Sequence, residues 1–430
     1  MTHKVTWLQP VVVLGLCLSA AALQAQYLET VIPVGESPQD ILWNPVSNKV
    51  YTANGEAGSV TIIDGATNHV RATVAVPDCP TFLCWNSVNN RVYVTCGDQN
   101  WLCVIDGVGD TLVRKVRIRG YPCNMAFDAM RNKLYVESAD DMMIRVYDGT
   151  ADTLVAEAWI GVVPWKLLWH PATDRVFVST ECDTASSLYV IDCSADTVAA
   201  RVHHGATYDM CRNPVNNLVY VNDDHGTSVV SQFGDSVLTL VPIYGWSMCF
   251  VPRPNSILTA WNSVGVIDCD SNLVRATIPI GATTIVADTL RGKAYAANYN
   301  SGQLHVIDAL ADTLIKTMPM GTYPYAMCWN STNSRVYVAD GMANVVYIIR
   351  DTSSAIEEDR SYSARPRLGA TVTCGTLFLP GQREADVFSV SGCRVAVLHP
   401  GRNSLRALAP GTYFVRPIGT KEVQRITLVR

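Results

Sequence analysis

Charged residues are scarce in this chain. Asp, Glu, Lys and Arg make up 17% of its 430 residues, against about 25% in an average soluble protein. The formal net charge is −5 and no basic run is present, so the sequence lacks the electrostatic footprint of a nucleic-acid-binding protein. Nucleic acid is therefore not an expected partner. Hydrophobic residues reach 48%, which favours a large buried core.

Long apolar runs are also scarce. Beyond the N-terminal region, no stretch reaches the roughly 18 apolar residues of a membrane-spanning helix, so no transmembrane span is expected in the mature chain. The N-terminus has the pattern of a signal peptide, with Lys4, an apolar run over 11–18 and small residues up to Ala25. We interpret residues 1–25 as a signal peptide, which predicts export.

Sequence motifs for catalysis and metal binding are missing. The chain contains no CxxC, GxSxG, HExxH, P-loop or CxxCH motif, and no GxGxxG that opens a helix. Helical periodicity is almost absent as well. These absences predict no catalytic residue, no metal ligand and no cofactor.

What the chain does contain is a repeat. The segment Asn44–Tyr51 returns at Asn86–Tyr93, a spacing of 42 positions (86 − 44 = 42). A period of about 40–45 residues is typical of one four-stranded blade of a β-propeller. Further copies run over 128–135, 170–177, 213–220, 288–295 and 330–337, with a degenerate copy over 252–258.

One repeat divides into four short strands, expected over 41–43, 50–53, 60–63 and 70–76 and rich in β-branched residues. A column of Asn, Asp and Gly in the first hairpin predicts a turn with positive φ, because these residues tolerate it best. Its members are Asn48, Asn90, Asn132, Asp174, Asn217, Asn255, Gly292 and Ser334.

Two further columns are interpreted as structural. Aspartates that end the third strand are expected to accept turn N–H groups, and large aromatics are expected to fill the space between blades. The aspartates are Asp64, Asp106, Asp148, Asp192, Asp268 and Asp308. The aromatics are Trp43, Trp85, Phe127, Trp169 and Trp329.

The repeat resembles a known family. Val92–Thr95 and Val336–Ala339, followed by strand ends such as Val104–Asp106, are similar to the YVTN family of β-propeller repeats. The resemblance covers residues 27–352. It implies a propeller, and it says little about chemistry, because related propellers occur in bacterial and archaeal surface proteins and beside some periplasmic enzymes.

The copies predict eight blades, with seven as the alternative if the weak sixth copy (245–280) is not a blade. The eighth copy lacks a fourth strand, and the unmatched N-terminal segment 28–34 resembles the missing one. We expect this segment to pair with the strand near 345–350. Such pairing would close the ring and protect its edges.

The repeat stops after residue 352. Residues 353–367 are polar and are interpreted as a linker, and 368–430 as a small Ig-like β-sandwich. Phe388–Val395, Asn403, Leu408–Arg416 and Ile426–Arg430 resemble the C-terminal sorting domain of type IX secretion cargo. The resemblance implies type IX-like secretion machinery as a partner and delivery to the cell surface or medium of a bacterium with an outer membrane. A stabilising domain without a sorting role is the alternative.

Fourteen cysteines are present, and export permits disulfides. Cys84 and Cys328 precede the repeated tryptophan and are expected to be buried thiols. Cys96 with Cys103, and Cys374 with Cys393, are candidate pairs.

A ligand site is expected where propellers usually have one, at the loops that lead into the innermost strands around the central channel. Aromatic rings there would stack on sugars or other flat ligands; the alternative is that they only plug the channel. The candidate ligand-binding residues are Tyr121, Trp165, Lys166, Tyr208, Trp246, Tyr323 and Tyr325.

The loops between second and third strands carry acidic residues. Carboxylates are the oxygen ligands that Ca²⁺ takes, yet no EF-hand or nonapeptide calcium loop is present. They are interpreted as solvated turns, with Ca²⁺ binding as the alternative. The residues are Glu137, Asp140, Asp141, Glu181, Asp183, Asp223, Asp224 and His225.

Together these features favour a secreted or cell-surface propeller that binds a glycan, a peptide or a partner protein. An enzyme, such as a propeller hydrolase or lactonase with a channel-bound metal, is the first alternative. A structural component of a surface layer is the second. The fold by itself does not separate them, because one fold hosts many functions.

Overall fold

The computed structural model describes residues 25–180, 187–203, 205, 207–353 and parts of 371–428. Contacts divide the chain into two compact units, Met1–Ile356 and Glu357–Arg430. Within the described residues all regular structure is β-strand, and none of it forms a helix long and apolar enough to cross a membrane.

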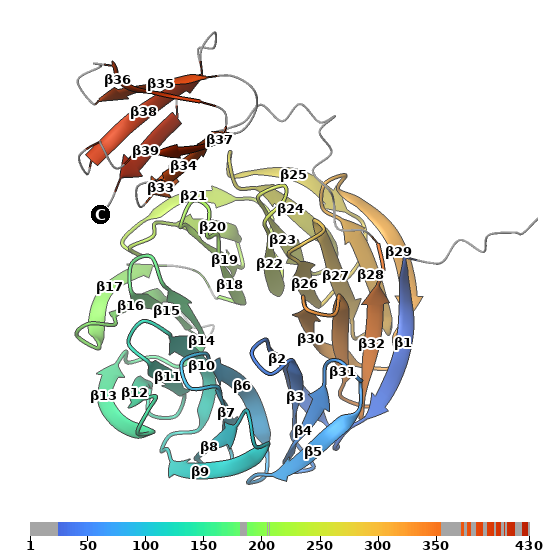
Figure 1. The fold of residues 1–430 in the computed structure, drawn as a ribbon. Coiled ribbons are helices and arrows are strands. Elements are labelled where there is room, and N and C mark those ends of the chain that lie inside the picture. Colours follow the sequence, from blue (N-terminus) through green and yellow to red (C-terminus); the bar gives the residue numbers. More distant parts are fainter. Residues whose placement is uncertain are drawn as a thin grey trace, which may run out of the picture. The chain divides into compact units, whose positions relative to one another are not determined.

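The first unit is a ring of eight four-stranded antiparallel sheets (Figure 1). Blade 1 contains β2 (Pro38–Asn44), β3 (Lys49–Asn54), β4 (Ser59–Asp64) and β5 (Val70–Ala75). Blade 2 contains β6 (Pro80–Asn86), β7 (Arg91–Cys96), β8 (Trp101–Asp106) and β9 (Thr111–Arg117). Blade 3 contains β10 (Pro122–Asp128), β11 (Lys133–Ser138), β12 (Met143–Asp148) and β13 (Thr153–Trp159). Blade 4 contains β14 (Pro164–His170), β15 (Arg175–Thr180), β16 (Ser187–Asp192) and β17 (Thr197–His203).

The second half of the ring repeats this order. Blade 5 contains β18 (Asp209–Arg212), β19 (Val219–Asp223), β20 (Gly226–Val230) and β21 (Val237–Val241). Blade 6 contains β22 (Ser247–Val251), β23 (Ser256–Ala260), β24 (Val264–Asp268) and β25 (Leu273–Ile278). Blade 7 contains β26 (Thr284–Asp288), β27 (Lys293–Asn298), β28 (Gln303–Asp308) and β29 (Thr313–Pro319). Blade 8 contains β30 (Pro324–Asn330), β31 (Arg335–Asp340), β32 (Val345–Asp351) and β1 (Gln26–Pro33).

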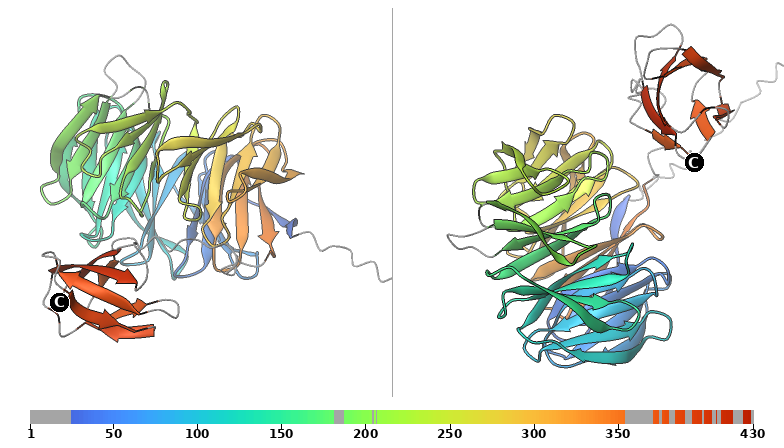
Figure 2. Two further views of the ribbon diagram at one scale, coloured as in Figure 1. Left: turned by 90° about the horizontal axis from the view of Figure 1, so that it is seen from above. Right: turned by 90° about the vertical axis from the view of Figure 1, so that its left-hand side faces the viewer.

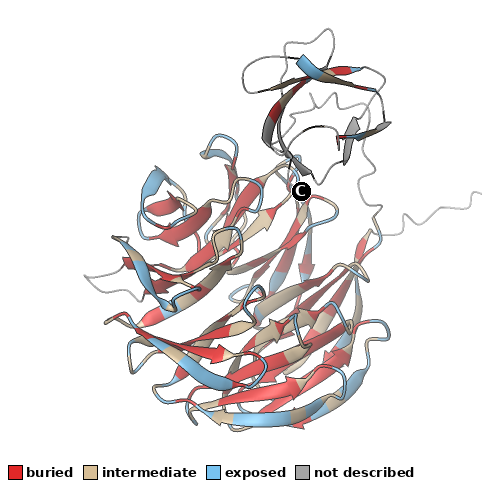
Figure 3. Ribbon diagram, turned by 60° about the vertical axis from the view of Figure 1, so that its left-hand side comes forward, coloured by how far each residue is buried: buried red, intermediate tan, exposed pale blue. Residues whose placement is uncertain are grey.

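The first strand of every blade lies at the ring axis, and the last strand lies at the rim (Figure 1). Seen from its side, the ring has strands that run between its two faces (Figure 2). The second and third strands are almost wholly buried and the rim strands are largely exposed (Figure 3). The apolar core therefore lies between neighbouring blades, as the low charge content suggests.

The N-terminal strand closes the ring, which confirms the expected closure. β1 pairs antiparallel with β32, from Gln26 opposite Asp351 to Pro33 opposite Val345. Ile32 is buried in the cluster between blades 8 and 1. Glu29 also binds the buried Arg335 guanidinium through both carboxylate oxygens, at 2.5 and 2.8 Å.

The weak sixth copy forms a complete blade, so the number is eight, and the alternative of seven is wrong. Strands β22 to β25 pair in order, although β22, β23 and β24 have only five residues each. Their buried residues join the cluster that blade 6 shares with blade 7. The sixth copy therefore forms a blade, although its sequence matches the repeat poorly, because its strands pack against blade 7.

The turn columns behave as predicted. All eight residues of the first-hairpin column have positive φ, from 48° at Asn48 to 66° at Gly292. Ser334 also adopts this conformation, with φ of 54°. The aspartate column caps the next turn: Asp148 Oδ1, for example, accepts the N–H groups of Thr150 and Ala151 at 2.8 and 2.7 Å.

The repeated aromatics lie between blades, also as predicted. Trp85 packs in the cluster of blades 1 and 2, Trp169 in that of blades 3 and 4, and Trp329 in that of blades 7 and 8. Each ring therefore fills space that a single blade cannot fill alone.

Neighbouring blades are also joined by polar contacts that the sequence interpretation missed. In β7, the buried Tyr93 hydroxyl donates to Asp152 Oδ1 of blade 3 at 2.8 Å, and Arg91 binds Oδ2 of the same aspartate at 2.8 Å. The same contact recurs at Tyr135 with Asp196 and, with an asparagine, at Tyr220 with Asn272. The tyrosine of the second strand therefore packs in the core and also links its blade to the next one by a hydrogen bond.

The cysteine expectations are met in part. Cys84 and Cys328 are half-buried rather than fully buried. Cys96 and Cys103 are buried free thiols in one cluster, and the adjacent Cys103 thiol, together with burial, raises the pKa of Cys96. Cys374 and Cys393 lie outside the described residues.

The second unit contains two small sheets. The five-stranded sheet has the order β33 (Thr371–Thr373), β39 (Gln424–Leu428), β38 (Gly411–Pro417), β35 (Ala385–Ser389) and β36 (Arg394–Leu398). The two-stranded sheet pairs β34 (Thr376–Leu379) with β37 (Gly401–Ser404). The core of the second unit is formed by Ala385, Val387, Leu398, Leu405, Tyr413 and Val415.

Candidate functional site

Two aromatic stacks lie on one face of the ring, the face that carries the loops leading into the inner strands. The first stack joins blades 5 and 6. Trp246 lies 4.0 Å from Trp261 and 6.1 Å from Tyr208 between ring centroids, with interplanar angles of 17° and 24°. Trp246 remains 42% exposed, so the stack presents aromatic surface to solvent.

The second stack joins blades 7 and 8. The Tyr323 ring lies 4.9 Å from Tyr299 and 5.8 Å from Tyr325. Tyr325 is 45% exposed. Both stacks combine residues of the loop that leads into an inner strand with a residue that follows a second strand, so they lie on the same face of the ring.

Charged residues stand near the start of the inner strands of blades 1, 4 and 5. Two residues after the proline that begins an inner strand, the repeat places Asp40 in β2 and Lys166 in β14. Asp209 holds the corresponding place in β18. Both aspartates accept the N–H of the next inner strand: Leu83 donates to Asp40 at 2.8 Å and Met248 donates to Asp209 at 2.9 Å. The carboxylates therefore tie adjacent blades together at the channel.

Lys166 supplies the positive charge at this level. Its ammonium lies 2.9 Å from Asp209 Oδ1. The pKa of Lys166 is raised, chiefly by Asp209, with Asp40 and Tyr325 contributing across the channel from blades 1 and 8. The ammonium thus stays charged at neutral pH while part of the side chain remains open to solvent.

Asp40 has an altered affinity for protons. Burial raises its pKa to about 6, against the opposing effect of the N–H groups of Leu83 and Ile41 and of Lys166. A mild fall in pH below neutral therefore removes the negative charge of Asp40. A neutral or weakly cationic ligand fits this charge better than an anion.

The next level along the inner strands is apolar. Two residues beyond Asp40 and Asp209, inner strands carry aliphatic side chains or thiols instead of charges. Asp40 raises the pKa of Cys84 and Cys328, and Asp209 raises that of Cys211 and Cys249, although burial is the larger cause in each case. The charged level is therefore bounded on one side by a layer of low polarity.

The structure places all seven sequence-predicted residues on this face and brings some of them together. It joins Tyr208 to Trp246 and Tyr323 to Tyr325. Tyr121 instead covers a neighbouring hairpin, because its ring lies 3.0 Å from where a Cβ on Gly97 would stand. Trp165 is 48% exposed, and its carbonyl accepts the Asn124 amide at 2.9 Å.

Two aromatic residues of the site were missed as candidates: Trp261 and Tyr299. The aromatic pair could have been found by aligning the residue that follows the second strand. Blades 1, 2, 3 and 8 have a small residue there, such as Gly55 or Gly97, whereas blades 6 and 7 have Trp261 and Tyr299. The departure from the repeat was the signal.

The acidic loops differ from their interpretation as solvated turns, which is wrong for two of their residues. Glu137 and Asp223 are buried, at 2% and 3% exposure. Glu137 accepts the N–H of Asn124 at 3.1 Å, and Asp223 accepts those of His225 and Gly226. These carboxylates anchor loop backbone. Glu181 and Asp183 lie outside the described residues.

The ring and its channel-face residues define the first unit as an eight-bladed β-propeller. Solved structures agree with this fold. Hydrazine synthase of Kuenenia stuttgartiensis superposes with a TM-score of 0.55 and 16% identity, over 77% of this chain and 99% of that one. The computationally designed Ika8 protein superposes with a TM-score of 0.61 and 13% identity, over 74% of this chain and 96% of that one. Neither a protein-family model nor a curated protein matches the sequence.

Proposed function

We propose that this protein is a binding module whose channel face captures a glycan or a similar flat, weakly polar ligand. The observation that carries the proposal is the pair of exposed aromatic stacks around Trp246 and Tyr325. Aromatic faces of this kind bind the apolar faces of sugars and peptide rings at low entropic cost. Lys166, Asp40 and Asp209, near the start of the inner strands, would orient ligand hydroxyl or amide groups by hydrogen bonds.

The channel charges favour binding over metal-dependent hydrolysis. A channel metal would need carboxylate oxygens free to coordinate it. Here Asp40 and Asp209 each bind main-chain N–H groups of the next blade, and Asp209 also binds the Lys166 ammonium. The positive charge that a metal would bring is already supplied by Lys166.

Replacing Trp246 or Tyr325 with Ala is expected to weaken ligand binding about two- to tenfold, since one aromatic contact is worth about 0.5–1.5 kcal/mol. A glycan array identifies the ligand for the wild type, and isothermal titration calorimetry then compares the variants. The matched control is Trp159→Ala, because Trp159 is 70% exposed but lies on the rim strand β13. Equal affinities for Trp246→Ala, Tyr325→Ala and wild type would refute the proposal.

The proposal extends to location: we infer that the protein is exported and delivered to the cell surface through its C-terminal unit. The signal-peptide pattern over 1–25 and the resemblance of 368–430 to a type IX sorting domain support it. A ligand-binding face on an exported protein would meet extracellular glycans or partner proteins.

Deletion of residues 365–430 is expected to leave the propeller in the periplasm. The measurement is immunoblotting of periplasmic, outer-membrane and culture fractions, with protease resistance as a control that the truncated propeller is folded. Surface delivery at the wild-type level would show that the C-terminal unit has no sorting role.

A further inference from the structure

A polar contact recurs between blades on the ring face opposite the aromatic stacks. The inner strand of one blade ends in an asparagine whose amide donates to the positive-φ asparagine of the next blade. Asn44 donates to Asn90 at 2.7 Å, and Asn86 donates to Asn132 at 2.9 Å. Asn213 with Asn255 and Asn330 with Asn48 repeat the contact. Each pair matches one donor with one acceptor.

Between blades 3 and 4 this pair is replaced by two aspartates. Asp128 ends β10, and Asp174 holds the positive-φ position before β15. Both carboxylates are acceptors, so the repeated hydrogen bond cannot form when both are ionised. Asp128 is fully buried, and its Oδ2 has no hydrogen-bond partner; Asp174 Oδ1 also has none.

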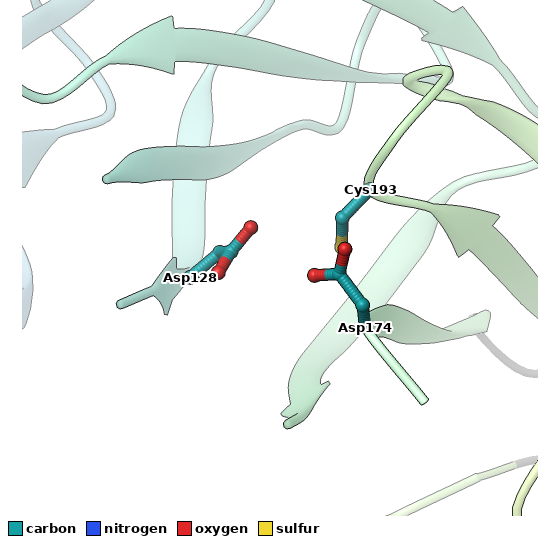
Figure 4. Close-up of side chains that lie close together, drawn as sticks. All are labelled: Asp128, Asp174 and Cys193. Carbon is teal, nitrogen blue, oxygen red and sulfur yellow. The ribbon is translucent and has the colours of Figure 1, made fainter. Parts of the chain in front are cut away.

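A thiol completes the group. At the position where blades 1 to 3 have Gly65, Gly107 and Gly149, blade 4 has Cys193, which is fully buried. The ligand atoms of Asp128, Asp174 and Cys193 all lie within 4.8 Å of one another. Their side chains point toward one another from three separate segments (Figure 4).

The neighbouring cations do not bind either unpartnered oxygen, Asp128 Oδ2 or Asp174 Oδ1. Arg131 binds Asp174 through its other oxygen, Oδ2, at 2.6 Å. Lys133 binds Asp196 and the main-chain carbonyl of Cys193. Blade 7 shows the contrast: there Asp288 is also buried, but Arg291 binds its Oδ2 at 3.1 Å.

We propose that Asp128, Asp174 and Cys193 bind a divalent cation of the zinc class that links blades 3 and 4. Two carboxylates and one thiolate are a ligand set that Zn²⁺ accepts, with water as a fourth ligand. Ligand atoms around tetrahedral zinc lie about 3.5 Å apart, so small side-chain rotations bring this group to bonding distance. Asp174 and Arg131 are partly exposed, at 19% and 40%, which opens a path for the ion from solvent.

The ion would act as a structural link. A ligand that binds only the folded state raises stability by mass action, and this one would join the last residue of one inner strand to two turns of the next blade. The ion would also bind two facing carboxylates that are both hydrogen-bond acceptors. Without it, Asp128 and Asp174 would have to share a proton to form a hydrogen bond. Burial and the nearby Asp174 raise the pKa of Asp128, against the effect of the turn N–H groups.

The test uses the full chain freed of metal by a chelator and then titrated with Zn²⁺. Asp128→Asn restores the amide found in blades 1, 2, 5 and 8, so this variant is expected to fold. We expect calorimetry to show that wild type binds one more equivalent of Zn²⁺ than Asp128→Asn does. The affinity of the variant for Zn²⁺ at this site should be lower by on the order of 100-fold or more. We also expect Zn²⁺ to raise the melting temperature of wild type but not of the variant.

The thiol is tested separately with Co²⁺, whose thiolate bond gives a near-ultraviolet absorption band. Cys193→Gly is expected to lose the band. Cys269→Gly is the matched control, because Cys269 holds the same repeat position beside the amide pair Asn213 and Asn255; it should keep the band. Equal zinc binding by wild type and Asp128→Asn would overturn the proposal. So would an absence of zinc binding by wild type together with a higher melting temperature for Asp128→Asn, which would indicate a shared proton only.

Discussion

Removal of the N-terminal strand β1 is expected to cause the largest loss of stability of any short deletion in the ring. Without residues 26–33, the edge of β32 loses the partner strand with which it pairs from Val345 to Asp351. The buried Arg335 guanidinium also loses its partly exposed partner Glu29, which leaves a buried charge without its carboxylate. An unpaired edge strand recruits other chains, so we expect aggregation or strand-mediated dimers, measured by light scattering and thermal unfolding.

A peptide with the sequence of residues 26–34 provides the control. Added in trans, it should restore a monomeric ring and most of the melting temperature. The same peptide with Ile32→Asp should not, because Ile32 is buried between blades 8 and 1. A deletion variant that stays monomeric and unfolds at the wild-type temperature would contradict the closing role of β1.

Replacement of Asp152 with Ala is expected to lower the free energy of unfolding by about 2–4 kcal/mol. Asp152 is 3% exposed and accepts hydrogen bonds from Tyr93 and Arg91 of the preceding blade. Its loss leaves a buried hydroxyl and a partly buried guanidinium underpaired. Ala would also be strained at the φ of 51°. Urea unfolding of the two proteins measures the difference.

Asp152→Asn is the matched comparison. Two other blades use asparagine in this position: Asn68 accepts from Tyr337 at 3.2 Å and Asn272 accepts from Tyr220 at 2.6 Å. Asparagine also tolerates positive φ. This variant should lose about 1 kcal/mol, mainly from the weaker contact with Arg91. If the two variants were equally destabilised, the charge on Asp152 would matter more than its hydrogen-bond geometry.

Most of the fold was predictable because the repeated residues determine strands and turns through contacts with their near neighbours in the sequence. Turn residues at Asn48 and its equivalents adopt positive φ for reasons contained within four residues. Aspartates such as Asp148 cap the turn that follows them directly. Even ring closure could be predicted, because residues 28–34 resemble the strand that the eighth copy lacks.

The candidate site was predictable only in part. The loop face and the aromatic residues on it follow from the propeller repeat, and Tyr208, Trp246, Tyr323 and Tyr325 do lie there. Trp261 and Tyr299 were overlooked because they stand in a different loop of the repeat. Their contact with the predicted residues requires two loops to meet at the ring face, and no single segment of sequence contains that contact.

By itself, the sequence determined the blade, the strand that closes the ring and the conformations of the turns, but it left eight and seven blades both open. Each depends on neighbours along the chain or on the period of about 42 residues. Only the tertiary structure decided which polar side chains meet: Lys166 with Asp209, Tyr93 with Asp152, and Asp128 with Asp174 and Cys193. Each of these contacts joins adjacent blades across a whole repeat or more, although Asp174 and Cys193 share blade 4, so ring geometry, not sequence proximity, brings the partners together.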